Sequence, residues 1–287
     1  MRIQMEKVMH AVFFLAALVS ILAVALICIF LFANGLPAMG EIGFRDFLLG
    51  RLWAPMDLPQ SFGIFPMIVG SIYVTAGAIL IGVPIGVLTA IFLSQYCPAS
   101  LYRVVKPAIQ LLAGIPSVVY GFFGLMVIVP FVRNYLGGSG YSILSASILL
   151  GIMILPTIIG VSESAIRTVP REYYEGAVAL GATHERAVFA TVVPAAKSGI
   201  LASVILGVGR AIGETMAVVM VAGNQARVPS SILQGVRTLT TNVVLEMGYA
   251  FGLHRGSLIA TGVVLFVFIL IINLLFSVIK RRTSHGN

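Results

Sequence analysis

Two charged side chains lie inside a stretch of the chain that is otherwise apolar. Arg210 and Glu214 are four residues apart in the segment GVGRAIGETMAVVMVAGN, residues 207–224. Residues at that spacing share one face of an α-helix, so we expect the guanidinium and the carboxylate to lie together. The planar guanidinium can donate two parallel charge-assisted hydrogen bonds to two oxygens of one anion. The pair therefore predicts an oxyanion site, in which Glu214 orients Arg210 and keeps binding weak enough for release.

Two neutral side chains, Thr215 and Asn224, are candidates for additional donors in the same stretch. Charged side chains in an apolar membrane helix are costly and normally face a bundle interior or a wet cavity, which favours a functional site. A structural interpretation stays open, in which Arg210 and Glu214 only hold neighbouring helices in register, because buried ion pairs are weak evidence for any one role.

The composition places this stretch in a lipid bilayer. Hydrophobic residues make up 59% of the chain, charged residues only 10%, and the mean hydropathy is +1.05. A soluble domain carries about a quarter charged residues. The net charge of +8 does not indicate nucleic-acid binding, because the cations are scattered at the ends of apolar runs without a basic stripe interleaved with aromatic residues. We expect an integral membrane protein.

Six apolar runs are long enough to cross a bilayer, which takes about 20 residues. They cover about 10–33, 64–93, 108–132, 143–163, 200–222 and 258–279. The first run is longer than a signal-peptide core and lacks a convincing cleavage site, so we expect a retained anchor. The predicted fold is all-α, with an N-terminal helix and outer loop at 1–63, a membrane core at 64–280, and a short cytoplasmic tail at 281–287.

The distribution of lysine and arginine predicts that both termini are cytoplasmic. Eleven cations then lie inside and six outside, with Arg210 left out as intramembrane, in agreement with the positive-inside rule. The inner set is Arg2, Lys7, Arg103, Lys106, Arg167, Arg171, Arg186, Lys197, Lys280, Arg281 and Arg282. The outer set is Arg45, Arg51, Arg133, Arg227, Arg237 and Arg255.

This orientation exposes the polar stretch 164–199 to the cytoplasm, and its pattern predicts two short helices. Pro170 suits the first turn of a helix, Gly181 allows a sharp turn, and Thr183 is a candidate N-cap for a second helix that Pro194 ends. The apolar face of this second helix is Ala187, Val188 and Val192. Such a pair suits a groove on another protein. A solvated connector, or helices lying on the membrane surface, stays open.

Residues 175–194, EGAVALGATHERAVFATVVP, resemble the EAA–x3–G–x9–I–x–LP pattern of the cytoplasmic coupling loop in type I ABC importer permeases. The positions that match are Glu175, Ala177, Gly181 and Pro194. The departures are Gly176, Thr191 and Val193, which keep small or β-branched side chains. The resemblance implies that this loop docks in a cleft of an ATPase subunit and passes its motion to the membrane helices. The implied coupling residues are Glu175, Gly176, Ala177, Gly181 and Pro194.

Residues 112–125, LAGIPSVVYGFFGL, and residues 207–224 are similar to the PstC-type permease subunits of phosphate ABC importers. The similarity runs from about residue 64 to the C-terminus. It implies a type I permease fold in a prokaryotic cell membrane, with inorganic phosphate passing Arg210, Glu214, Thr215 and Asn224. The implied partners are a PstA-like second permease, a PstB-like ATPase dimer and a PstS-like extracytoplasmic phosphate-binding protein. A PstA-type permease, or a permease for another oxyanion, is the alternative.

No pattern in the chain indicates an enzyme. The histidines His10, His184, His254 and His285 lack ligand spacing, and Cys28 and Cys97 lack metal or redox spacing. The chain has no G-x-x-x-x-G-K-[ST] loop, so ATP and Mg²⁺ are expected on the partner ATPase and no cofactor in this chain. An ion-coupled carrier or a channel is the alternative from another class, although it would need no coupling loop.

Other residues are expected to have structural roles. Gly77, Gly82 and Gly86 in the second run favour close helix packing over a hinge, because small residues let backbones approach in lipid. Glu163 is interpreted as a solvated end of the fourth helix. Trp53 suits an anchor at the outer membrane interface.

Overall fold

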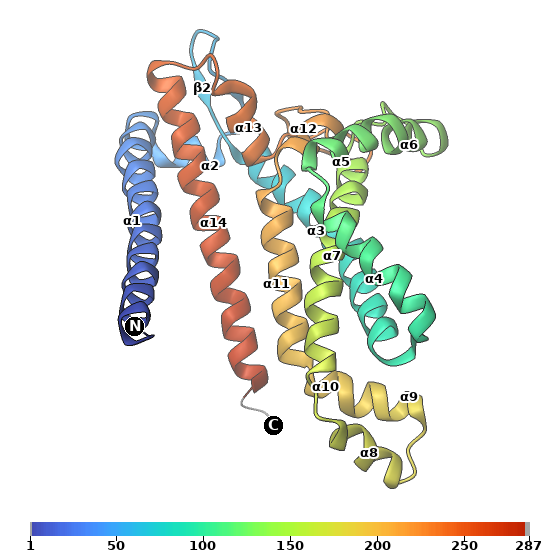
Figure 1. Ribbon diagram of the computed structural model, residues 1–287. Coiled ribbons are helices and arrows are strands. Elements are labelled where there is room, and N and C mark those ends of the chain that lie inside the picture. Colours follow the sequence, from blue (N-terminus) through green and yellow to red (C-terminus); the bar gives the residue numbers. More distant parts are fainter. Residues whose placement is uncertain (1, 285–287) are drawn as a thin grey trace.

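The protein is a bundle of long helices that carries short helices and one small hairpin at its two ends (Figure 1). The computed structural model describes residues 2–284. The elements of the first half are α1 (Arg2–Ile42), α2 (Phe44–Leu49), β1 (Trp53–Ala54), β2 (Ser61–Phe62), α3 (Phe65–Ile91), the π-helical turn η1 (Phe92–Tyr96), α4 (Ala99–Gly114), α5 (Ser117–Phe123), the π-helical turn η2 (Gly124–Ile128) and α6 (Val129–Tyr135). Those of the second half are α7 (Ile143–Arg167), α8 (Arg171–Ala179), α9 (His184–Ala187), the π-helical turn η3 (Val188–Val192), α10 (Val193–Ala195), α11 (Lys197–Gly213), α12 (Met216–Val221), α13 (Leu239–Glu246) and α14 (Gly252–Ser284).

In the described part of the chain, five helical segments are long and apolar enough to cross a membrane, and a sixth span results if one bent pair is counted. The five are Val8–Ile42, Phe65–Tyr96, Ser117–Tyr135, Ile143–Arg167 and Gly252–Leu275. The bent pair joins His184–Ala195 to Lys197–Gly213 at an angle of 68°. These segments confirm the predicted all-α membrane fold, and they correspond in order to the six predicted runs.

The central contact of the bundle is between α3 and α7, and glycines on α3 bring the two helices together. A Cβ atom at Gly82 would lie 2.7 Å from the side chain of Ile154 and 2.9 Å from the carbonyl oxygen of Gly151. Gly77 likewise faces Ser147, whose hydroxyl donates a 3.2 Å hydrogen bond to the backbone of α3. The close packing predicted for these glycines is therefore confirmed, because a larger side chain has no room there.

Two of the predicted membrane spans are broken by residues that are not helical, and both breaks border the candidate anion site. The run 108–132 breaks between α4 and α5, where Ile115 and Pro116 are extended with ψ angles of 127° and 143°. The residue before a proline disfavours the helical conformation, which accounts for the break at Ile115. The run 200–222 breaks between α11 and α12. The membrane helices near the middle of the chain are thus broken twice, and α5 and α12 pack against each other beyond the breaks.

The β1–β2 hairpin and the predicted coupling loop lie at opposite ends of the bundle (Figure 1). The hairpin pairs Trp53 with Phe62 and packs near α13, whereas α8 and α9 project from the other end (Figure 1). The N-terminal end of α1 and the C-terminal end of α14 lie at the same end as α8 and α9 (Figure 1). Residues 285–287 of the predicted tail 281–287 lie outside the described residues.

Candidate anion path and coupling loop

Arg210 and Glu214 do not share a helix face, so this prediction is wrong. The helix α11 ends at Gly213, and Glu214 is extended with φ −70° and ψ 132°. The next helix, α12, begins only at Met216, so the chain turns at Glu214 and Thr215. Arg210 takes part in none of the ion pairs found among the side chains that the structure describes. The apolar run hid this break, because Gly213 and Thr215 carry it and no proline marks it.

The Glu214 carboxylate instead caps the helix that follows it. One carboxylate oxygen, Oε1, accepts hydrogen bonds from the backbone N–H groups of Thr215 at 3.1 Å and Ala217 at 3.2 Å. The first N–H groups of a helix have no partner within the helix, and a negative charge there is stabilised by the helix dipole. The backbone carbonyl of Glu214 accepts a 3.0 Å hydrogen bond from the hydroxyl of Thr240 in α13. The break is therefore held from both sides.

Among the described side chains, none forms an ion pair with the guanidinium of Arg210, which leaves it available for another partner. Arg210 occupies the last turn of α11 and is exposed, in the position where the helix dipole favours a cation. It lies within electrostatic range of Tyr120, whose hydroxyl donates a 2.9 Å hydrogen bond to the carbonyl of Leu112 across the α4–α5 break. An unpaired charge within a membrane helix faces a water-filled space or a second protein surface. The geometry thus suits an anion that approaches the two breaks.

Thr215 and Asn224 are separated by the helix α12. The Thr215 hydroxyl lies at the break, where it donates to the carbonyl of Gly213 at 3.3 Å. Asn224 lies past the far end of α12, which is about 9 Å long at 1.5 Å per residue. Its backbone is left-handed with φ 52°, and its side-chain N–H donates to the carbonyl of Val219 at 2.8 Å. The structure therefore brings Glu214 and Thr215 together beside Arg210, and it places Asn224 elsewhere.

A buried polar cluster that sequence reasoning missed lies at the end of the bundle that carries the hairpin. The Glu246 carboxylate accepts the Trp53 indole N–H at 3.0 Å and is paired with Arg237. His254 Nε2 lies 2.8 Å from the other carboxylate oxygen. Trp53 is only 8% exposed, so the predicted interfacial anchor is wrong: its indole joins the hairpin to α13 and α14. Arg237 also donates to the backbone carbonyl of Asn224 at 3.1 Å, which connects the cluster to the end of α12.

The predicted coupling loop forms two helices that turn at glycine, as expected. Gly181 has φ +87°, a conformation that side chains other than glycine rarely adopt, and the Thr183 hydroxyl accepts the backbone N–H of Arg186. The predicted apolar face is buried at Ala187, Val188 and Val192. One detail differs, because Pro194 does not end the second helix. It sits in the first turn of α10, where a missing N–H costs nothing, and the chain bends afterwards at Ala196.

The residues of the coupling pattern form an accessible surface on this loop. Glu175, Gly176, Gly181 and Pro194 are exposed, and Ala177 is half-buried. Leu180 beside the turn is 91% exposed, which is unusual for a leucine unless a partner covers it. The loop is held as a unit, because the Tyr174 hydroxyl in α8 lies 2.9 Å from Nδ1 of His184 in α9.

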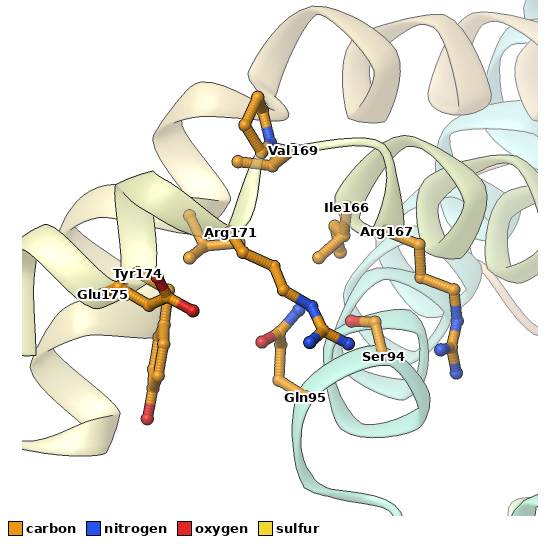
Figure 2. A pocket seen from close by; sticks show the side chains of 10 residues that line it. Ser94, Gln95, Ile166, Arg167, Val169, Arg171, Tyr174 and Glu175 are labelled. Atoms are coloured by element: carbon orange, nitrogen blue, oxygen red, sulfur yellow. The ribbon is translucent and has the colours of Figure 1, made fainter.

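A polar cavity of about 410 Å³ lies between the coupling loop and the end of α3. Arg171 extends from the start of α8 toward Ser94 and Gln95, and Arg167 lies on the other side of Ser94 (Figure 2). The lining residues are Ser94, Gln95, Ile166, Arg167, Val169, Pro170, Arg171, Tyr174, Glu175 and Val192. Glu175 of the coupling pattern therefore lines a cavity whose walls carry polar side chains.

Glu163 is not a solvated helix end, which corrects a further prediction. Only 1% of it is exposed, and its carboxylate is bound by Lys106, Tyr102 and Arg167. Since two of these donors lie 57 and 61 residues away, the apolar pattern of the fourth helix held no signal for them. Among the side chains that the structure describes, no group of three or more His, Cys, Asp or Glu residues could hold a metal ion.

Comparison with known proteins identifies relatives that share this architecture. A probable ABC transporter permease protein, YqgH, of Bacillus subtilis is 41% identical over 270 residues, which cover 91% of this chain and 87% of that protein. The phosphate transport system permease protein PstC of Mesorhizobium japonicum is 35% identical over 283 residues, which cover 91% of this chain and 86% of that protein.

Solved structures share the fold at low sequence identity. A chain in the structure of a bacterial alginate ABC transporter, in complex with an alginate pentasaccharide-bound periplasmic protein, has a TM-score of 0.61 at 16% identity, and the match covers 93% of this chain and 94% of that one. A chain of the inward-facing MetNI methionine ABC transporter has a TM-score of 0.58 at 21% identity, covering 77% and 94%. Residues 82–285 match the family model of the binding-protein-dependent transport system inner membrane component. The broken membrane helices, the exposed loop at one end and these matches lead to one conclusion: the chain belongs to the family of binding-protein-dependent transport system inner membrane components.

Proposed function

We propose that this chain is a permease subunit of an ATP-driven, binding-protein-dependent importer of inorganic phosphate. The observation that carries the proposal is the free guanidinium of Arg210 beside a broken membrane helix. Broken helices near the membrane midplane are common substrate sites, and a guanidinium fork suits two oxygens of a tetrahedral anion. The relatives named as PstC phosphate permeases support phosphate as the anion.

In this proposal, the chain forms half of the path and a second, PstA-like permease forms the other half. The surface of Glu175, Gly176, Ala177, Gly181 and Pro194 docks on a PstB-like ATPase dimer, which binds ATP and Mg²⁺. Both termini and the coupling loop face the cytoplasm. A PstS-like binding protein delivers phosphate at the opposite end, where the hairpin and α13 lie. The N-terminal segment 1–63 and the core 64–280 act as one membrane unit.

The mechanism follows from the fixed break. The Glu214 carboxylate binds the backbone N–H groups at the start of α12. Arg210 therefore has no carboxylate partner among the described side chains. An arriving phosphate supplies the missing negative charge while keeping part of its hydration. Thr215 offers a neutral hydroxyl at the same break. Because no rigid cage of donors surrounds Arg210, binding stays weak and the anion can leave when the cavity opens inward.

The proposal is tested by replacing Arg210 in the complete importer reconstituted in proteoliposomes. We expect Arg210→Gln to lower phosphate uptake about tenfold or more, the effect of losing a charge-assisted hydrogen bond of about 1.5–3 kcal/mol. Arg210→Lys keeps the charge without the fork and should retain an intermediate rate. Arg227→Gln, an exposed outer arginine, is the matched control and should transport normally. Loss of complex assembly in Arg210→Gln would instead favour the helix-register role.

A further inference from the structure

The cytoplasmic end of α7 carries a buried carboxylate that the anion path does not use. The Lys106 ammonium lies 2.5 Å from Oε2 of Glu163. The Tyr102 hydroxyl donates to Oε1 at 2.7 Å, and Arg167 Nε donates to the same oxygen at 2.8 Å. The side chain of Glu163 is only 2% exposed. Two cations and one hydroxyl therefore converge on a single carboxylate.

This cluster is the main polar attachment of α4 to the bundle. Tyr102 and Lys106 belong to α4, which has no buried residue and packs on α7. The hydrogen bond to the Glu163 carboxylate raises the pKa of Tyr102, in agreement with a protonated hydroxyl that donates to this carboxylate. Removing one partner of a buried ion pair leaves an uncompensated charge, which is strongly unfavourable. A change at Glu163 is thus felt directly by α4.

The same carboxylate is connected to the coupling loop. Arg167 lies one turn after Glu163, and its Nη2 donates a 2.9 Å hydrogen bond to the carbonyl of Leu93 in η1. Arg167 also lines the cavity beneath α8, which begins four residues later at Arg171 (Figure 2). The guanidinium stacks over the Tyr102 ring at 4.7 Å. A displacement of α8 must therefore act on the groups that bind Glu163.

At its other end α4 leads into the path. It ends at Gly114, and the chain continues through the Ile115–Pro116 break into α5. The helix α5 packs against α12, where a Cβ atom at Gly121 would lie 3.1 Å from the Cα atom of Ala217. Ala217 is also the residue whose N–H is capped by Glu214. A continuous set of packed elements joins α4 to the broken helix beside Arg210.

We propose that Glu163 is a positioning residue that transmits motion of the coupling loop to α4, and through α5 to the α11–α12 break. The proposal rests on the proposed transport function, because it concerns the efficiency of that function. Glu163 touches neither the anion nor ATP. Glu163 keeps α4 attached to α7, and the movement of α8 sets the position of this attachment. When the attachment is lost, ATP is still hydrolysed but the path does not open fully.

The test measures phosphate uptake and ATP hydrolysis on the same proteoliposomes that hold the complete importer. The variants are Glu163→Gln, Lys106→Met and the double substitution. Arg103→Met is the matched control, because Arg103 is an exposed cation on α4 whose side chain binds only its own helix at Ala99. Complex assembly is checked by size-exclusion chromatography before each measurement.

We expect Glu163→Gln and Lys106→Met each to lower the phosphate transported per ATP about fivefold or more, while the complex stays assembled and hydrolysis continues. The double substitution should be no worse than either single one, because both remove the same contact. Arg103→Met should keep the wild-type ratio. Unchanged ratios in both single variants, additive losses, or proportional losses of uptake and hydrolysis would overturn the proposal. A wild-type complex that transports no phosphate would instead refute the proposed function itself.

Discussion

At the scale of residues, the two buried carboxylates of the described chain are held, whereas Arg210 is not. Glu163 at the end that carries α8 and Glu246 at the end that carries the hairpin each bind donors from more than one element. Arg210 lies between them in the sequence and takes part in none of the ion pairs among the described side chains. Burying a charge without partners is costly, so each of these carboxylates needs the donors that surround it. The free cation is the group left for a ligand.

Trp53→Phe tests the outer cluster, because it removes the indole N–H and keeps an aromatic ring. Glu246 then loses a donor at a buried position, which costs about 1–3 kcal/mol. We expect the purified complex to melt at a lower temperature, measured by the loss of its size-exclusion peak after heating. Tyr135→Phe, which removes a hydroxyl from a residue that is 75% exposed, should leave the melting temperature unchanged. Equal melting of both variants and the wild type would contradict a stabilising role for the cluster.

The sequence identified Arg210 and Glu214 but not their geometry. The prediction assumed that a helix continues through residues 200–222, and Glu214 turned out to cap a new helix instead of pairing with Arg210. The cluster at Glu246 could not be predicted, because Trp53 lies 193 residues earlier in the chain. Local spacing predicts contacts within one helix, and contacts between distant segments need the fold.

At the scale of elements, the bundle depends on the close approach of α3 and α7. Gly82 faces Ile154 and the backbone of Gly151, so added atoms must displace one of the two helices. The glycines of the second apolar run were predictable as packing positions, and the break before Pro116 follows from proline chemistry. The break at Glu214 had no comparable marker.

Gly82→Val tests this packing. Overfilling a packed interface costs about 1–3 kcal/mol, so we expect less assembled complex in the membrane and a lower melting temperature. Gly160→Val is the control within the partner helix α7, because a Cβ atom at Gly160 would meet nothing within 4 Å. Assembly is measured by co-purification of the permease with its partner subunits. Normal assembly of Gly82→Val, or equal losses in both variants, would contradict the packing account.

Gly181→Pro tests the coupling loop. Proline cannot adopt φ +87° and lacks the N–H that Gly181 donates to the carbonyl of Val178 at 2.9 Å. We expect the ATPase to dissociate from the membrane, or ATP hydrolysis to continue without uptake; Glu175→Lys should act in the same direction. ATPase retention on washed membranes and uptake are the measurements.

Gly137→Pro provides a matched control for the loop variant. Gly137 has φ +90° and donates its N–H to the carbonyl of Val132 at 3.1 Å, so the backbone conflict is the same. It follows α6, at the end of the bundle opposite to α8 (Figure 1). The control should keep the ATPase bound. If Gly181→Pro binds the ATPase and transports normally, the loop is not the docking surface.

At the scale of the whole molecule, the chain has the features of one part of a larger assembly. The first helix, α1, is almost entirely exposed along its apolar span and contacts α14 near one end, where Phe32 packs on Phe266. The ion-pair clusters around Glu163 and Glu246 lie at the two ends of the bundle. The broken helices beside Arg210 lie between these clusters, and the exposed loop of α8 and α9 lies at one end. A single passage driven from that loop is the function that unites these features.

The measurement that tests this account most directly is ATP-dependent uptake of radiolabelled phosphate into membrane vesicles. The vesicles carry the partner subunits with or without this chain, and sulfate is added as a competitor. The account predicts uptake that requires both ATP and this chain and that sulfate leaves unchanged. Uptake that is independent of the chain would contradict the account. So would uptake that needs the chain but not ATP, which is the behaviour of an ion-coupled carrier.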